Sequence, residues 1–212
     1  GKVRLIVNGI ATQRYRAAPP ADAIPGLVKA PGELWLGTLA GLRAVKNLPR
    51  LVRVFATLPE GWRLVVVGEG PERAAILLEA ERCGVRSRVH LAGYAADPAR
   101  VVGLFDLFAL SSDSEQFPIS VVEAMAAGKA IAAPAVGDVA TMVAEPNRRF
   151  IAAAGDESAL GQVLRELAVD APLRAGLGQA NRAYAEAHYD ETTMISAYRQ
   201  TYAAAMGLQA FP

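Results

Sequence analysis

Two glutamates, Glu115 and Glu123, lie eight positions apart in the middle of the chain, within the stretch SEQFPISVVEAMAAG (114–128). Pro118 fits the first position of a helix, because its ring presets the helical φ and its missing amide needs no partner there. Gly128 fits the residue that closes such a helix. One carboxylate would then lie in the loop entering the helix, and the other about a turn and a half inside it.

The amides of the first helical turn add a second chemical feature. Those of Ile119, Ser120 and Val121 lack acceptors within the helix and point beyond its end, where they can bind an anion. Glu115 and Glu123 would stand on either side of that anion and accept hydrogen bonds from hydroxyl groups. The layout suits the diphosphate of a nucleotide sugar, with one carboxylate on the sugar and the other on the ribose.

Both glutamates could instead be solvated surface residues, which is the ordinary use of glutamate in a helix. Glu123, however, is flanked by apolar residues on both sides, in the run Val121-Val122-Glu123-Ala124-Met125. A charge among such neighbours is costly without a partner. The flanking residues therefore favour the ligand-binding interpretation.

The stretch resembles the Glu-x7-Glu signature of retaining, family-4-type (group 1) glycosyltransferases of the GT-B fold. Other motifs similar to that family follow in the family's order and cover roughly residues 5 to 155. They are Val7-Asn8-Gly9-Ile10, Lys46-Asn47, VGEGPER (67–73), HLAGY (90–94), EAMAAG (123–128) and Val136-Gly137-Asp138. Each motif is weak alone, whereas the ordered set is a strong resemblance.

The resemblance implies the C-terminal, donor-binding domain of an enzyme in which two Rossmann-like domains face each other. Such an enzyme moves a sugar from a nucleotide diphosphate to an acceptor hydroxyl with retention, in polysaccharide or glycoconjugate synthesis, without a metal or other cofactor. The N-terminal acceptor domain would be absent from this chain, which starts with Gly1 rather than Met. We therefore expect a fragment that is inactive alone, with a nucleotide sugar and the missing domain as its partners.

By resemblance, Lys46 and Glu115 would be catalytic. Lys46 would contact the diphosphate, Glu115 the hydroxyls of the transferred sugar, and Glu123 the ribose diol. Gly137 and Asp138 would lie near the donor sugar as secondary candidates. The full expected donor-binding set is Lys46, Arg43, Gly68, Tyr94, Glu115, Phe117, Pro118, Ile119, Ser120 and Glu123.

The sequence departs from the family pattern at one position. A family arginine normally precedes the lysine by five residues, where this chain has Gly41. Arg43 can take over its role, although a residue two positions further along a loop need not point the same way. Loss of a preorganised cation slows a reaction by orders of magnitude, so catalytic competence stays open.

Several candidates have plain structural interpretations. Lys46 can simply flank a helix. Gly68 belongs to a Gly-x-Gly turn that fails the dinucleotide fingerprint, because Arg73 replaces its third glycine. Tyr94 can lie beside the nucleobase, but an aromatic residue at a strand end is more often part of the core. The two histidines, His90 and His188, have no metal-binding spacing, and no hydrolase elbow is present.

Composition excludes several classes of protein. A net charge of +1 gives no basic field for nucleic acid, and no apolar run of the 212 residues is long enough for a spanning helix. The single cysteine, Cys83, cannot form an internal disulfide and is expected near a helix end. These features favour the cytoplasm. Contact with the inner face of the membrane, in the full-length protein, would be made by the missing half.

Short apolar runs separated by helical patterns predict an α/β fold with a doubly wound parallel sheet, a Rossmann-like GT-B half. Asn47, Pro71, Asp97-Pro98 and Asp156 or Ser158 are the expected helix starts, and residues 11 to 31 are expected as an exposed loop. The predicted strands are Val3–Val7, Leu34–Leu39, Leu64–Val67, Val89–Leu91, Leu107–Leu110 and Ala130–Ala133. The predicted helices are 48–58, 71–84, a short one from 97, 118–128, 160–167 and 191–206.

The expected division places a nucleotide-sugar-binding domain at residues 1–155 and an all-helical C-terminal tail at 156–212, packed on the same domain. Two other classes share this architecture. A nucleotide-sugar epimerase would carry a histidine in its site and a pyridoxal phosphorylase a Schiff-base lysine, and the site region offers neither convincingly. The remaining alternative is a homologue that keeps the scaffold but has lost turnover, which Gly41 favours.

Overall fold

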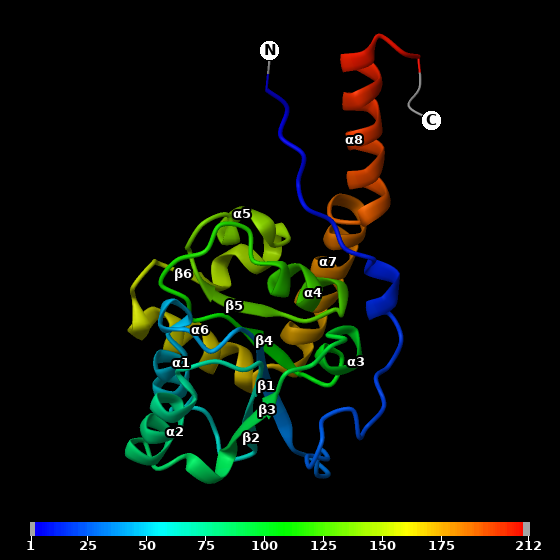
Figure 1. Cartoon of the computed structure of the whole chain (residues 1–212). Coiled ribbons are helices and arrows are strands. Elements are labelled where there is room, and N and C mark those ends of the chain that lie inside the picture. Colours follow the sequence, from blue (N-terminus) through cyan, green and yellow to red (C-terminus); the bar gives the residue numbers. More distant parts are fainter. Residues whose placement is uncertain (1–2, 210–212) are drawn as a thin grey trace.

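A computed structural model describes residues 3–209, and a six-stranded parallel sheet forms its centre (Figure 1). The strand order is β3-β2-β1-β4-β5-β6, so the chain builds one half of the sheet outward from β1 and then returns to start the other half at β4. This confirms the doubly wound fold and creates a topological switch point between β1 and β4. The strands are β1 (Leu34–Leu39), β2 (Trp62–Val67), β3 (Val89–Gly93), β4 (Leu107–Ala109), β5 (Ile131–Pro134) and β6 (Ile151–Ala152).

Helices cover both faces of the sheet, and for that reason the strands read as continuous apolar runs. One face packs on α1, α2 and α6, and the other on α3, α4 and α5, while α7 contributes Leu177 to the first core and Ala185 to the second. The helices are α1 (Leu48–Phe55), α2 (Arg73–Arg82), α3 (Ala99–Val102), α4 (Ile119–Ala126), α5 (Val139–Met142), α6 (Glu157–Val169), α7 (Ala171–His188) and α8 (Glu191–Met206). Short 3-10 turns are η1 (Thr12–Tyr15), η2 (Ala44–Lys46), η3 (Arg86–Arg88) and η4 (Glu145–Phe150).

Capping side chains mark the starts of α1, α6, α7 and α8. The Asn47 side chain accepts a hydrogen bond from the Arg50 amide at 3.3 Å, and Asp156 rather than Ser158 accepts from the Ala159 amide at 2.8 Å. Helix α8 has the predicted bounds. Helix α2 starts two residues after Pro71, and α7 is a separate helix within the region predicted only as helical.

The N-terminal stretch differs from the prediction. Val3–Val7 is not a strand: Val3 and Leu5 are 92% and 87% exposed, and Arg4 Nη2 donates to Gln200 Oε1 of α8 at 3.2 Å. In Figure 1 this segment runs beside α8, away from the sheet. Residues 11–31 are also not a simple exposed loop, because Tyr15, Ile24 and Leu27 are buried in the core.

The end of α4 is fixed by α7. Gly128 closes α4 with a φ of +71°, and the Lys129 amide donates to the Ala124 carbonyl at 2.9 Å in a Schellman arrangement. A Cβ at Gly178 of α7 would lie only 2.0 Å from the Gly128 carbonyl oxygen. Since α7 also donates from Arg182 Nε to the Ala126 carbonyl at 3.1 Å, close helix contact positions α4 on the sheet.

We expect Gly178→Ala to destabilise the chain by about 1–3 kcal/mol, because the added methyl group must push α7 away from Gly128. Gly176→Ala, in the same helix with no atom within 4 Å of the added Cβ, is the matched control and should stabilise by about 0.5–1 kcal/mol. Urea unfolding of both variants measures the effect. Equal stability changes would contradict this account of how α7 holds α4.

Candidate functional site

The loops that follow β1 and β4 meet at the switch point through an ion pair. Lys46 Nζ, on the loop after β1, lies 2.6 Å from Glu115 Oε1, on the loop after β4. Ser112 Oγ donates to the same carboxylate oxygen at 2.6 Å. The Glu115 side chain is only 9% exposed, so the partners offset the cost of burying its charge. The two residues predicted as catalytic therefore form one unit.

Further hydrogen bonds hold the two loops together. The Asp113 amide donates to the Val45 carbonyl at 2.8 Å, and Ser111 Oγ donates to the Lys46 carbonyl at 2.9 Å. Arg50 of α1 pairs with Asp113 at 2.7 Å. These contacts fix the backbone on both sides of the ion pair, so Lys46 and Glu115 are held in place by the fold.

Two amides at the start of α4 are available to an anion. Among the described residues, no hydrogen bond from the Ile119 or Ser120 amide is found, as expected for the first residues of a helix. Two expectations are corrected: Pro118 is the N-cap rather than the first helical residue, and the Val121 amide donates to the Pro118 carbonyl at 3.0 Å. The side chain of Phe117 packs edge-on against Tyr189, with ring centroids 5.5 Å apart.

The loop before α5 supports the backbone of Glu115. Gly137 has a φ of +54°, and a Cβ there would lie 2.4 Å from the carbonyl oxygens of both Glu115 and Gln116. The Asp138 amide donates to the Gln116 carbonyl at 2.8 Å. Gly137 and Asp138 thus contact the backbone of the Glu115 loop. At position 137 only glycine permits this close approach.

Glu123, on α4, is half-buried and has one hydrogen-bond donor among the described residues. The Tyr15 hydroxyl donates to its Oε1 at 2.9 Å. Burial raises the pKa of the Glu123 carboxyl; the hydrogen bond from Tyr15 lowers it, and the nearby charge of Asp97 raises it. The Glu123 side chain is therefore held by one neutral donor in a partly apolar environment.

A cleft of about 420 Å³ brings together predicted residues from three parts of the chain: the loop after β2, the loop after β3, and α4. Gly68, Tyr94, Ser120 and Glu123 line it, whereas Lys46 and Glu115 lie outside its lining, on the loops at the switch point. The complete lining is Leu39, Ala40, Gly41, Val67, Gly68, Glu69, Tyr94, Ala95, Pro98, Ser120 and Glu123.

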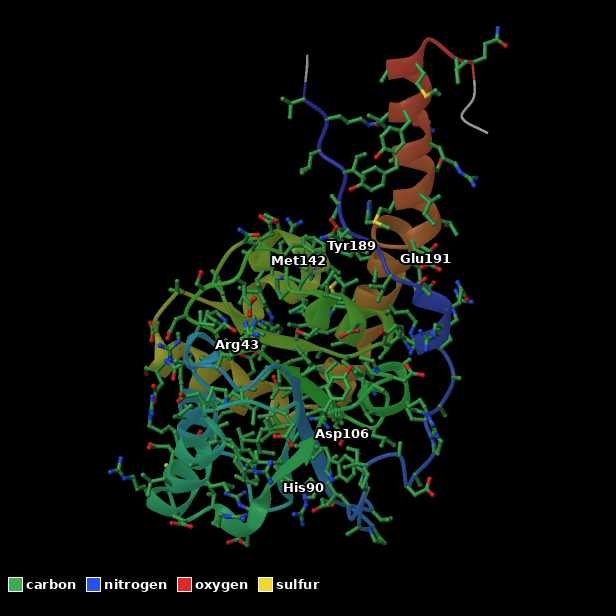
Figure 2. The ribbon with its side chains drawn as sticks, in the orientation of Figure 1. Arg43, His90, Asp106, Met142, Tyr189 and Glu191 are labelled. Carbon is green, nitrogen blue, oxygen red and sulfur yellow. The ribbon has the colours of Figure 1, made fainter. Side chains whose placement is uncertain are left out.

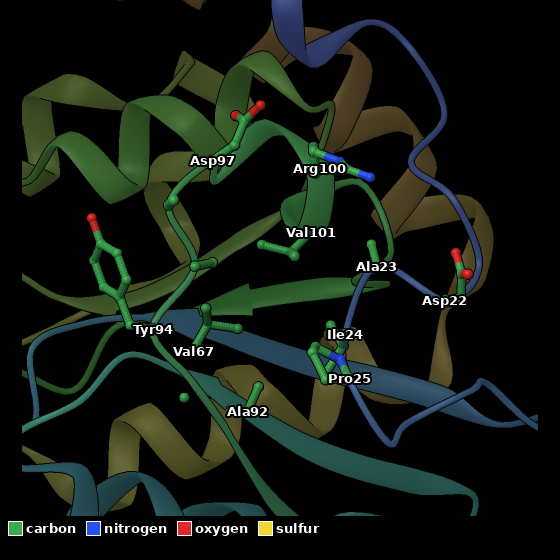
Figure 3. A pocket seen from close by; sticks show the side chains of 13 residues that line it. Asp22, Ala23, Ile24, Pro25, Val67, Ala92, Tyr94, Asp97, Arg100 and Val101 are labelled. Atoms are coloured by element: carbon green, nitrogen blue, oxygen red, sulfur yellow. The ribbon is translucent and has the colours of Figure 1, made fainter.

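A second hollow of about 350 Å³ adjoins this cleft and shares Val67, Tyr94 and Ala95 with it. Figure 3 shows Ile24 and Pro25 of the N-terminal segment across the hollow from Tyr94. The Tyr94 side chain is 78% exposed, so the interpretation of this residue as part of the core is wrong. Its ring is open to a ligand in either hollow.

The loops after β1 and β2 touch through their backbones. A Cβ at Gly68 would lie 1.9 Å from the Ala40 carbonyl oxygen, so this position requires glycine. Gly41 is different, because the nearest atoms to an added Cβ are Arg43 Nε and the Glu69 carbonyl oxygen, both at 4.0 Å. The exposed Arg43 side chain (Figure 2) therefore lies beside the point where a side chain at position 41 would begin.

The other candidates are placed away from the cleft lining. His90 lies within β3 (Figure 2), where burial lowers its pKa, and Cys83 caps the end of α2 as expected. Within residues 3–209, no cluster of three or more His, Cys, Asp or Glu side chains is arranged for a metal ion. No helix in the same part of the chain is both long and apolar enough to cross a membrane.

Sequence reasoning missed Tyr15, Ser112 and Asp97 as neighbours of the two glutamates. Ser112 lies three residues from Glu115, and a spacing of three in a loop gives no indication of contact. Tyr15 is 108 residues away from Glu123. Only the folded arrangement reveals these contacts.

Comparison with known proteins defines the class to which this fold and site belong. The family model "Glycosyl transferases group 1" matches residues 24–184, and the chain therefore belongs to this glycosyltransferase family. The chain is 29% identical over 218 residues to the D-inositol 3-phosphate glycosyltransferase of Xylanimonas cellulosilytica, covering 94% of this chain and 51% of the relative. It is 32% identical over 146 residues to the lipopolysaccharide glucosyltransferase WaaG of Escherichia coli, covering 66% and 39%.

Solved structures confirm the GT-B, Rossmann-like architecture. Anabaena HepE, crystallised with UDP and glucose, superposes with a TM-score of 0.84 at 23% identity over 95% of this chain and 57% of its own. Sucrose-phosphate synthase from Thermosynechococcus elongatus gives a TM-score of 0.81 at 25% identity, covering 96% and 54%. The chain spans about half the length of the curated relatives it matches.

The raised pKa of Glu123 predicts how stability depends on pH. An unfolded glutamate titrates near pH 4.3, at about the value of model peptides, so the folded chain binds this proton more tightly than the unfolded chain. The wild-type chain should therefore lose stability relative to Glu123→Gln as the pH rises from about 4.3 through the folded pKa. Urea unfolding of both proteins across this range measures the difference, and a constant difference would contradict the raised pKa.

Proposed function

We propose that this chain binds the nucleotide-diphosphate sugar donor of a retaining glycosyltransferase. The observation that carries the proposal is the convergence at the switch point: Lys46 pairs with Glu115, and α4 follows with two free amides, on Ile119 and Ser120, and with Glu123 in the cleft lining. Cationic and amide groups favour a diphosphate, and each carboxylate can accept hydrogen bonds from a sugar hydroxyl. The complexes of HepE with UDP and with UDP-glucose support this class of ligand.

In the proposed reaction, the bond from the anomeric carbon to the diphosphate breaks and its electron pair leaves with the diphosphate. Lys46 and the Ile119 and Ser120 amides then stabilise a charge that grows as the bond breaks, which is the condition for lowering the barrier. An acceptor hydroxyl attacks the same face of the sugar. Because the departing diphosphate is on that face, its oxygen is the nearest base for the hydroxyl proton.

The proposed acceptor site lies on a domain outside this chain. The relatives are about twice as long as the matched region, with the chain covering 44% and 51% of two of them. Alone, the chain should bind a nucleoside diphosphate weakly and transfer no sugar. Sugar transfer by the 212 residues by themselves would contradict this division of labour.

Calorimetric titration with uridine, guanosine and adenosine diphosphates tests the proposal and identifies the base. Glu123→Ala should weaken nucleosides and nucleoside diphosphates alike, because it removes the ribose acceptor. Lys46→Ala should weaken only the diphosphates, by roughly tenfold or more for a charge-assisted contact. The double variant should abolish binding.

Two controls keep this titration interpretable. Lys46→Ala leaves the Glu115 carboxylate without its cation. The thermal unfolding of this variant is therefore compared with that of Lys46→Arg, which keeps the positive charge. Arg199→Ala, on the exposed surface of α8, removes a cation far along the chain from the site and should leave affinity unchanged. Failure of all three diphosphates to bind the wild-type chain would overturn the proposal.

A homologue that has lost turnover is the second candidate, favoured by Gly41 in place of the family arginine. An added Cβ at Gly41 meets no atom beyond its chain neighbours closer than 4.0 Å, so the backbone leaves room for the start of a side chain. The nearby Arg43 guanidinium supports the active interpretation, because it supplies a cation beside the same position.

Substitution of Gly41→Arg in the full-length protein separates the two candidates. If Arg43 already supplies the cation, the rate of sugar transfer should change little, while Arg43→Ala should reduce it by about 10²–10³. A large gain from Gly41→Arg, with no loss from Arg43→Ala, would instead indicate a decayed site. Steady-state assays with the donor found by titration give both numbers.

A further inference from the structure

The carboxylate of Glu123 is bound by a residue from the far N-terminal part of the chain. Tyr15 is 8% exposed, and its ring belongs to the same hydrophobic core as the residues of α3 and α4. Its hydroxyl donates to Glu123 Oε1 at 2.9 Å. No other hydrogen bond to this carboxylate is found among residues 3–209, which leaves Oε2 as the open acceptor at the edge of the cleft.

A phenol is well suited to hold this carboxylate. It is neutral, so it donates a hydrogen bond without forming an ion pair that would neutralise the acid. Burial and the charge of Glu123 both raise the pKa of the Tyr15 hydroxyl, which keeps the donor protonated. A hydrogen bond to the ionised form favours that form, and it also restricts the rotation of the carboxylate.

The position of Tyr15 is itself fixed by contacts at the start of the chain. Tyr15 ends the η1 turn, where Thr12 Oγ1 donates to Asp190 just before α8. The Ile10 amide donates to the Tyr189 carbonyl at 2.9 Å. The neighbouring Arg14 pairs with Asp97 at 2.9 Å. Arg16, just after Tyr15, pairs with Glu186 of α7 at 2.8 Å, so the hydroxyl reaches Glu123 from a segment that is held on both sides.

We propose that Tyr15 is a positioning residue for ribose recognition: its hydroxyl aims the Glu123 carboxylate so that the chain selects nucleotides that carry ribose hydroxyls. This inference rests on the proposed function, since it assigns Glu123 to the ribose. It goes further by giving the specificity to a contact between the N-terminal segment and α4. Tyr15 acts through Glu123 and does not itself touch the nucleotide.

The test compares ribonucleotides with their 2′,3′-dideoxy forms. The 212-residue chain and Tyr15→Phe are titrated with uridine, guanosine and adenosine diphosphates and with the three dideoxy analogues. For the ribonucleotide that binds, Tyr15→Phe should raise Kd about tenfold, as for loss of one hydrogen bond to a charged group. The dideoxy analogue should bind both proteins within about twofold, because it makes no contact with Glu123. A purely structural role would weaken both ligands equally.

Two further variants make the outcome decisive. In a Glu123→Ala background, Tyr15→Phe should have no additional effect on Kd, since the two residues act as one unit. Tyr198→Phe removes a hydroxyl from an exposed tyrosine of α8 and should leave both affinities unchanged. If the wild-type chain prefers the ribonucleotide and Tyr15→Phe keeps that preference, the inference on Tyr15 fails alone. If no diphosphate binds the wild-type chain, the proposed function fails with it.

Discussion

The structure depends on the divergence of two neighbouring parallel strands. Because the chain leaves β1 toward one half of the sheet and leaves β4 toward the other, the loops after these strands separate at their carboxyl ends. The ion pair between Lys46 and Glu115 joins the loops across this opening. Each residue is placed by the loop that follows its own strand. The site is thus a consequence of topology.

The two buried or half-buried carboxylates of the site, Glu115 and Glu123, lower the stability of the fold. Glu115 has two partners, Lys46 and Ser112, whereas Glu123 has only the neutral Tyr15 hydroxyl among residues 3–209, and burial raises the pKa of the Glu123 carboxyl. A core made of apolar residues alone would be easier to stabilise. The partly satisfied acid at the cleft is what a binding site for hydroxyl groups requires, because a fully paired carboxylate has no acceptor to offer.

Local signals allowed much of the fold and part of the site to be predicted. Asn47, Asp156 and Gly128 act within a few residues of themselves, so their capping roles can be read from the sequence. The Val3–Val7 prediction failed because alternating apolar residues do not show whether a partner strand exists. The two-residue strand β6 is too short to give a pattern, and Tyr15 meets Glu123 through a contact that no local spacing encodes.

The glycines of the site show which of its features the fold requires. Gly68 and Gly137 each touch a carbonyl oxygen of a neighbouring loop, so a larger residue at either position would push the loops apart. Gly41 makes no such contact. Packing around the Cβ position therefore does not explain why residue 41 is glycine. At position 41 the backbone thus leaves room for the start of a side chain, and the nearest side-chain atom, Arg43 Nε at 4.0 Å, belongs to a cation.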